Sequence, residues 1–186
     1  MKKFIRVLTI FMMVLSLTGI AVAEKAPKEV IDLANADLAA LGNDPAIIAA
    51  VKAENAKGKS LSQIKEMDEK WKGTAGLADY MTAMMENKCG RYLRSIQSTK
   101  SYMAEIFVMD DQGANVCMTD KTSDYWQGDE AKFKNSFSGG KGAVFVDEVE
   151  FDDSTQTYLS QISVPVMENG EAIGAITFGV DIDNLN

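Results

Sequence analysis

The stretch ISVPVMENGEAIGAITFGVDIDNL, residues 162–185, decides the fold. Apolar and polar residues alternate on both sides of Asn169-Gly170, and this dipeptide is typical of a two-residue type I′ turn between antiparallel strands. We therefore predict a hairpin at the C-terminal end of the sequence, in which Glu168 pairs with Glu171.

Upstream of this hairpin the same alternation predicts three more strands, and helical periodicity replaces it before residue 100. The five predicted strands are 102–109, 114–119, 143–151, 157–167 and 171–182. The predicted helices are 27–41, 44–57, 60–71, a longer one at 77–98 and a short one at 129–137. Helices followed by antiparallel strands predict an α+β fold, with the long helix packed on one face of the sheet.

Capping residues mark the start of two of these helices. Asp44 precedes Pro45, which suits an N-cap followed by proline at the first helical position. Ser60 and Gln63 have the spacing of a capping box.

The register expected from the two hairpins separates two faces of the sheet. The first, apolar face carries Leu159, Ile176, Phe178 and Val180 and can bury a helix. The second face mixes aromatic, small and acidic residues, namely Phe145, Asp147, Tyr158, Ser160, Thr177, Gly179 and Asp181. This register places Tyr158 opposite Asp181 and Ser160 opposite Gly179. A turn around Asp153-Ser154 in the preceding hairpin places Val149 beside Tyr158 and Asp147 beside Ser160. Small residues beside polar groups favour a ligand pocket on the second face.

The N-terminus is typical of a secretory signal peptide at residues 1–23. Lys2, Lys3 and Arg6 precede an apolar stretch that ends in Ala21-Val22-Ala23. An uncleaved anchor is the alternative, but the apolar stretch of about 16 residues is short of the roughly 20 that span a bilayer. After the signal peptide we expect a helical segment at 24–74 and a sensor domain at 75–186.

Composition narrows the classes of function. The chain has 19 Lys and Arg against 27 Asp and Glu, a formal net charge of −8 at pH 7. This balance disfavours nucleic acid and anionic membrane surfaces as partners and suits cationic ligands. The sequence contains no histidine, which excludes c-type haem attachment, His-based zinc sites and triads with a histidine base.

Two cysteines, Cys89 and Cys117, lie in a predicted helix and a predicted strand. They can form a disulfide in an oxidising compartment, or they can be two buried free thiols. Sequence does not give their separation, and we slightly favour the free thiols.

Residues 77–186 resemble the Cache, or PDC, family of extracytoplasmic PAS-like sensors. The resemblance rests on AEIFVMDDQGANV (104–116), TSDYWQGDEAKF (122–133) and the C-terminal hairpin. It implies a PAS-like five-stranded antiparallel sheet, with a helix on one face and a small-molecule pocket on the other. Amino-acid-binding members place Arg, Trp and Tyr in the pocket roof. Here only Trp126 matches, and Asp124 and Gln127 stand where Arg and Tyr are expected.

The pattern and the resemblance together predict a periplasmic or secreted small-molecule sensor without its own output module, acting through a partner such as a membrane receptor or kinase. Tyr125 and Trp126 would cover the ligand, with Tyr158 beneath it. Asp147 and Asp181 would accept hydrogen bonds from an amine or another cation. The full expected binding set is Tyr125, Trp126, Phe145, Asp147, Tyr158, Ser160, Thr177 and Asp181. We expect no cofactor, no resident metal and no catalytic residue.

Two other functions compete with this interpretation. One is divalent-cation sensing, in which an acidic edge binds the cation. This edge consists of Glu148, Glu150, Asp152 and Asp153. Alternatively, two carboxylates on one face could do acid–base work in a small hydrolytic enzyme.

We predict that the exported protein begins at Glu24, because signal peptidase cleaves after the small-residue triplet. Intact-mass spectrometry of the exported protein checks this. A product that keeps residues 1–23 would indicate the uncleaved anchor instead.

Overall fold

The computed structural model describes residues 25–152 and 156–185, so the expected signal peptide lies outside the described residues. The N-terminal part contains α1 (Lys28–Leu33), the π-turn η1 (Ala34–Leu38), the 3₁₀ turn η2 (Ala39–Asn43), α2 (Pro45–Asn55), α3 (Leu61–Lys72), α4 (Asp79–Glu86) and α5 (Lys88–Gln97). The remaining elements are β1 (Met103–Met109), β2 (Asn115–Met118), α6 (Ala131–Phe137), η3 (Ser138–Gly140), β3 (Phe145–Asp152), β4 (Thr157–Glu168) and β5 (Glu171–Asp181). Among all the described residues, no helix is long and apolar enough to cross a bilayer.

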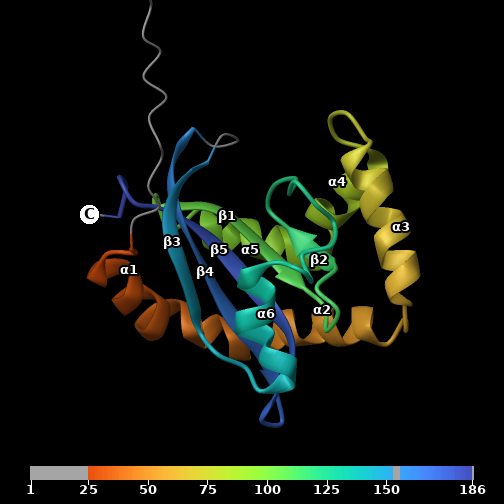
Figure 1. The fold of residues 1–186 in the computed structure, drawn as a ribbon, viewed down its shortest axis with the longest axis horizontal. Helices are drawn as coiled ribbons and strands as arrows, with labels where there is room; N and C mark the ends of the chain where they lie inside the picture. The colour runs from red at the N-terminus through yellow and green to blue at the C-terminus, as the bar shows by residue number, and fades with distance from the viewer. Residues whose placement is uncertain (1–24, 153–155, 186) are drawn as a thin grey trace, which may run out of the picture.

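The five strands form one antiparallel sheet in the order β2-β1-β5-β4-β3 (Figure 1). This confirms the predicted α+β, PAS-like architecture. Both predicted helix caps are present: the Asp44 side chain accepts from the N–H groups of Ala46 and Ile47, and Ser60 with Gln63 completes a capping box. Each cap satisfies backbone donors that a helix start otherwise leaves unpaired.

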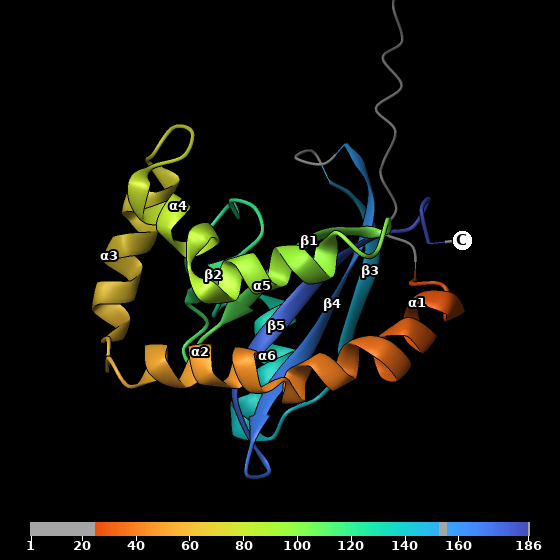
Figure 2. The same cartoon turned by 180° about the vertical axis from the view of Figure 1, so that it is seen from behind.

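The two faces of the sheet are covered by different helices. Figures 1 and 2 show α1, α2 and α5 on one face and α6 on the other. The first face buries Ile176, Phe178 and Val180 of β5 against residues such as Ile47 and Leu93. On the second face, a smaller core joins α3 and α4 to β1, β2 and α6 and includes Trp71, Met81, Phe107 and Phe133. The N-terminal helices therefore contribute to both cores.

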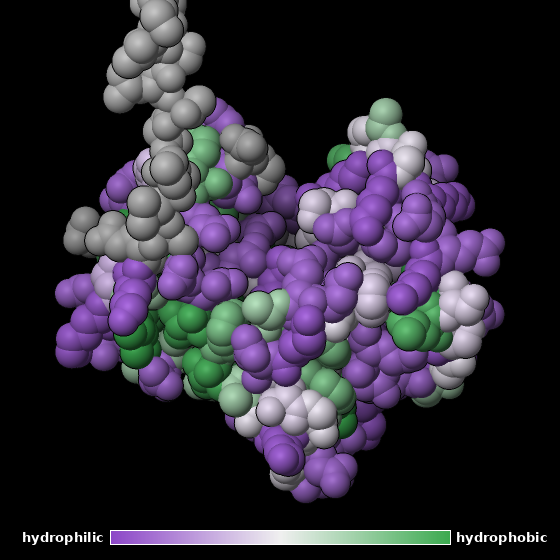
Figure 3. All heavy atoms as spheres, viewed as in Figure 1, coloured by the Kyte–Doolittle hydropathy of each residue, from purple (hydrophilic) through white to green (hydrophobic). Residues whose placement is uncertain are grey.

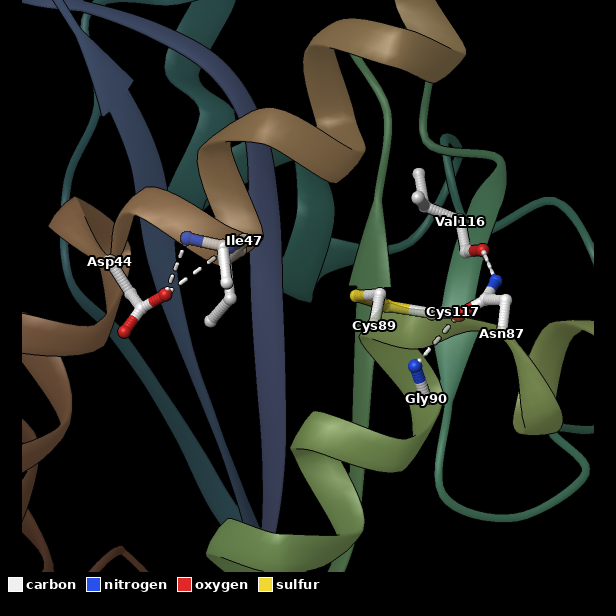
Figure 4. Close-up of a disulfide and its surroundings, with 8 residues drawn as sticks. Asp44, Ile47, Asn87, Cys89, Gly90, Val116 and Cys117 are labelled. Carbon is white, nitrogen blue, oxygen red and sulfur yellow. Dashed lines mark hydrogen bonds between the residues drawn. A yellow bond between two sulfur atoms is a disulfide. The ribbon is translucent and has the colours of Figure 1, made fainter.

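The prediction of a single long helix at 77–98 is wrong, because the helix is interrupted at Asn87. Asn87 has an extended backbone (ψ 171°), and its side-chain Oδ1 accepts the N–H of Gly90, which starts α5 as a separate helix (Figure 4). Gly90 is needed at this break, since a Cβ there would lie 2.2 Å from the carbonyl oxygen of Met85. The break lets α4 pack in the smaller core while α5 covers the opposite face of the sheet.

Cys89 and Cys117 form a disulfide, which corrects the slight preference for free thiols. The bond joins the first turn of α5 to β2, with the two Cα atoms 5.8 Å apart (Figure 4). Both cysteines are buried in the larger core. The pairing depends on the break at Asn87, which places Cys89 at the start of a new helix beside β2.

The expected strand register is wrong in β4, although the turn itself is correct. Glu168 pairs with Glu171 as predicted, but a bulge shifts the register between Val166 and Met167. Beyond it Leu159 pairs with Asp181, Gln161 with Gly179, and Ser163 with Thr177. A shift of one residue exchanges the faces of a strand. Leu159 therefore leaves the face covered by α2 and α5, and Tyr158 and Ser160 leave the face expected to bind ligand.

The β3–β4 register also differs from the prediction. Asp152 pairs with Thr157 and Val149 with Ser160, and a second irregularity lies between Val146 and Val149. Val149 was expected beside Tyr158, so its partner lies two residues further along β4, and the expected turn residues Asp153-Ser154 lie outside the described residues. Asp147 falls within the irregular stretch of the edge strand.

We predict that replacing both cysteines with serine lowers the free energy of unfolding by about 3–4 kcal/mol, because the bond closes a 28-residue loop in the unfolded chain. Urea unfolding of the wild type and the double variant without reductant measures the difference. Each single serine variant should lose a similar amount. Equal stability of wild type and double variant would contradict a structural role for the bond.

Candidate functional site

Two adjoining cavities lie on the face of the sheet opposite α2 and α5. The first has a volume of about 430 Å³ and the second about 310 Å³. They share Ser123, Lys132, Asp152 and Gln161, so we treat them as one polar groove. Figure 3 shows hydrophilic residues around a hollow in this part of the surface, between the β3–β4 hairpin and the loop after β2.

Strands from both halves of the sheet build the floor of the groove. Glu105 and Phe107 come from β1, and Gln161 comes from β4. Glu105 and Gln161 both pair with Gly179 of β5, which lies between them. Because Gly179 has no side chain, the two residues meet across it, and Gln161 Nε2 donates to Glu105 Oε1 at 3.2 Å. A Cβ on Gly179 would lie 2.6 Å from Cγ of Glu105.

Lys132 of α6 stands between the two cavities, and its side chain is only 11% exposed. Its Nζ lies 2.8 Å from Glu130 Oε2 and donates to Gln161 Oε1 at 3.0 Å. It also lies 5.5 Å from the centre of the Phe107 ring. A chain of polar contacts therefore runs from Glu130 through Lys132 and Gln161 to Glu105.

The Glu105 carboxyl has a raised pKa, and burial is the largest cause. Removal from water disfavours the charged form of a carboxyl group. The positive charge of Lys132 and the hydrogen bond from Gln161 act in the opposite direction, whereas Asp152 and Asp120 raise the pKa further. The balance leaves a carboxyl group whose ionised form would gain from a further donor or positive charge.

The loop after β2 forms the opposite wall of the first cavity and brings Lys121, Thr122, Ser123 and Gln127. Lys121 Nζ donates to the backbone oxygens of Thr74 and Gly76 at 2.9 and 3.0 Å. Gln127 is 1% exposed and donates from Nε2 to the carbonyl of Asp124 at 2.8 Å. Its Oε1 accepts no hydrogen bond from the described residues, which is unusual for a buried polar atom.

Negative charge dominates the groove. Among the described residues, its walls carry six carboxylates, from Glu105, Glu130, Asp147, Glu148, Glu150 and Asp152. They carry two ammonium groups, from Lys121 and Lys132. Both ammonium groups already have protein partners, as described above. The groove therefore has an excess of acceptors and of negative charge, most of it in the second cavity.

Of the eight residues expected to bind ligand, the structure places only Asp147 in the groove wall. Tyr125 and Trp126 were expected to roof the pocket, but both pack on the smaller core. The Tyr125 ring lies 5.8 Å from that of Trp71, and its hydroxyl accepts from Lys59. Trp126 Nε1 donates to the carbonyl of Gln112. These side chains are held by the protein's own atoms.

The other five expected residues also lie outside the groove lining. Tyr158 is 53% exposed and stacks edge-on against Phe151. Ser160 is buried and donates to the carbonyl of Asp147, and the Thr177 hydroxyl pairs with Ser163. Asp181 accepts from the backbone N–H groups of residues 183 and 184 in the turn after β5. Phe145 is half-buried on β3, opposite Ser163.

Sequence reasoning missed Glu105, Lys132 and Gln161, which form the centre of the groove. The correct β4 register would have placed Gln161 on the pocket face. Lys132 lies within a helix that was predicted, and its position over the sheet had no sequence signal. The acidic edge considered as an alternative site for a divalent cation contributes Glu148, Glu150 and Asp152 to the second cavity, and its fourth residue, Asp153, lies outside the described residues. Within the described residues, no three His, Cys, Asp or Glu side chains are placed to hold a metal ion.

No family model and no curated protein matches the chain. Among solved structures, it is similar to the ligand-binding domain of the Campylobacter jejuni chemoreceptor Tlp3 in complex with 4-methylisoleucine, with 11% identity and a TM-score of 0.42 over 84% of this chain and 60% of that one. It is also similar to the ligand-binding domain of the Pseudomonas aeruginosa amino acid chemoreceptor PctC in complex with GABA. The sequence identity is 13% and the TM-score 0.43, over 80% of this chain and 60% of that one. A third similar structure is the sensor domain of the Vibrio cholerae histidine kinase DctB. Its sequence identity is 12% and its TM-score 0.36, over 74% of this chain and 53% of that one.

The chain thus spans about 60% of the length of the Tlp3 domain. Likenesses this distant assign no ligand, so the site is interpreted from its own residues.

We predict that the difference in free energy of unfolding between Glu105→Gln and wild type shifts in favour of the variant as pH rises. The pKa of Glu105 is raised in the folded state, so the folded protein holds this proton more tightly than the unfolded chain does. The wild type therefore loses the contribution of this proton to its stability as pH rises from the ordinary glutamate range through the raised pKa. The glutamine variant does not titrate here and keeps its stability over the same range. Urea unfolding between pH 4 and pH 8 measures the difference. A constant difference across that range would contradict it.

Proposed function

We propose that this chain is a sensor domain that binds an amine-bearing or otherwise cationic small molecule in the groove. The observation that carries the proposal is the charge of the groove. Six carboxylates line it among the described residues, and its two ammonium groups are already paired within the protein. A cation entering this site gains attraction and hydrogen bonds, whereas an anion meets repulsion.

Individual residues have distinct roles in this proposal. Glu105 and Asp152 would accept from the donor group of the ligand in the first cavity, and Asp147 would contribute in the second. The unpaired Oε1 of Gln127 would accept one further hydrogen bond. Phe107 supplies an apolar floor, on which a short carbon chain can pack. A few polar groups around an apolar surface are typical of small-molecule sites.

We propose that the domain works outside the cytoplasm, in the periplasm or as a secreted protein. The N-terminal pattern of a signal peptide and the Cys89–Cys117 disulfide both support an oxidising compartment. We also propose that it passes its state to a partner protein, such as a membrane receptor or kinase. β5 offers a physical route, because its neighbours β1 and β4 carry Glu105 and Gln161 of the groove.

We predict that 1,4-diaminobutane raises the melting temperature of the protein, whereas succinate, a dianion with the same number of carbons, does not. A ligand that binds only the folded state stabilises it by RT ln(1 + [L]/Kd). Differential scanning fluorimetry at constant ionic strength and pH 7.5 measures both. Stabilisation by succinate but not by the diamine would contradict the proposed charge of the ligand.

A matched pair of variants assigns the binding to the groove. Glu105→Gln should weaken diamine binding by about tenfold, which corresponds to the loss of one charge-assisted hydrogen bond. Glu29→Gln removes the same charge from an exposed position on α1 and should leave binding unchanged. Equal weakening in both variants would indicate a general effect of net charge.

A further inference from the structure

One wall of the groove has almost no secondary structure of its own. The segment 122–127, which we call the wall segment, supplies Thr122, Ser123 and Gln127 to the groove. Within it only Trp126 makes a strand-like bridge, to Ala114. Its shape must therefore be fixed by contacts with other elements.

Asn115 of β2 makes two of these contacts, to Thr122 and Asp124, and Asp68 of α3 makes two more. Its carboxylate is buried, with 3% of the residue exposed, and Oδ1 accepts the backbone N–H groups of Tyr125 at 2.9 Å and Trp126 at 3.0 Å. Its Oδ2 lies 2.7 Å from Nζ of Lys72, and the same ammonium group reaches Asp124 at 3.1 Å. A buried carboxylate is tolerated only when such partners satisfy it. The contact therefore strongly favours one backbone conformation of the wall segment.

Trp71 and Lys121 hold the start of the wall segment to the same helix and to the turn after it. Trp71 is fully buried, and its Nε1 donates to the carbonyl of Thr122 at 2.8 Å. Lys121, adjacent to the segment, donates to the carbonyls of Thr74 and Gly76. The wall segment is thus attached to α3 at its start and its middle, and the adjacent Lys121 is attached to the turn after α3.

We propose that α3 is the positioning element of the ligand site and that Asp68 is its principal positioning residue. Asp68 does not line the groove. It acts through the wall segment, whose Thr122, Ser123 and Gln127 it holds in place before a ligand arrives. A site organised in advance binds more tightly, because less conformational freedom is lost on binding. The inference rests on the proposed function and extends it, since it makes the N-terminal helical segment part of the binding site.

The test compares four proteins: wild type, Asp68→Ala, Asp68→Asn and Ile64→Val. Asparagine keeps an acceptor oxygen for the two N–H groups, and alanine removes it. Ile64 lies one turn earlier on α3, fully buried in the smaller core, so its truncation lowers stability while the hydrogen bonds of Asp68 and Trp71 to the wall segment are kept. The affinity for 1,4-diaminobutane is measured by calorimetry, the melting temperature by fluorimetry, and backbone amide exchange of residues 122–127 by mass spectrometry.

We expect Asp68→Ala to raise Kd about tenfold or more and to speed amide exchange in the wall segment, with Asp68→Asn between it and wild type. Ile64→Val should lower the melting temperature but leave Kd within about twofold of wild type. Unchanged Kd in Asp68→Ala would overturn the inference. So would a rise in Kd in Ile64→Val that matches its loss of stability. If Asp68→Ala does not fold, the asparagine variant decides the question.

The design separates this inference from the function on which it rests. Failure of the wild type to bind the diamine contradicts the proposed ligand class, and amide exchange then decides the positioning role. Faster exchange confined to the wall segment in the Asp68 variants supports it. Exchange equal to that of wild type overturns it.

Discussion

The structure depends on the central position of β5, which is hydrogen-bonded to β1 on one side and to β4 on the other. Its alternating side chains set the chemistry of both faces: Ile176, Phe178 and Val180 enter the larger core, while Thr177 and Gly179 point to the opposite face. At Gly179 the missing side chain allows residues of the two neighbouring strands, Glu105 and Gln161, to hydrogen-bond across the strand. One strand thus supplies apolar burial on one face and the floor of the groove on the other.

Local signals in the sequence were enough to predict most elements of the fold. The Asn-Gly turn, the Asp44 and Ser60 caps and the period-2 strands act over a few residues, and each is found where expected. The break at Asn87 was missed because Asn is tolerated inside a helix, and its effect depends on a cap at Gly90 and on contacts with β2. The slight preference for free thiols was wrong for the same reason, since that break brings Cys89 beside Cys117.

The site could be predicted much less well than the fold. The face of β5 was correct, because side chains alternate along a strand wherever its partners lie. The faces of β4 depended on counting residues from the turn, and one bulge near Gly174 invalidated the count. That bulge is a tertiary feature: a Cβ on Gly174 would lie 2.3 Å from the carbonyl oxygen of Met109 on β1. Lys132 reaches the groove because α6 packs over the sheet, and this long-range packing leaves no pattern in the sequence around it.

The two faces of the sheet also differ in what they contribute to stability. Apolar burial in the larger core stabilises the fold without ligand. The groove has the opposite effect, because a desolvated Glu105, an unpaired Gln127 oxygen and crowded carboxylates each raise the free energy of the folded protein. These are the groups that a donor-rich cation would satisfy. In the proposed function, relief of this cost by a bound cation would give the sensor a difference in free energy between its empty and occupied states.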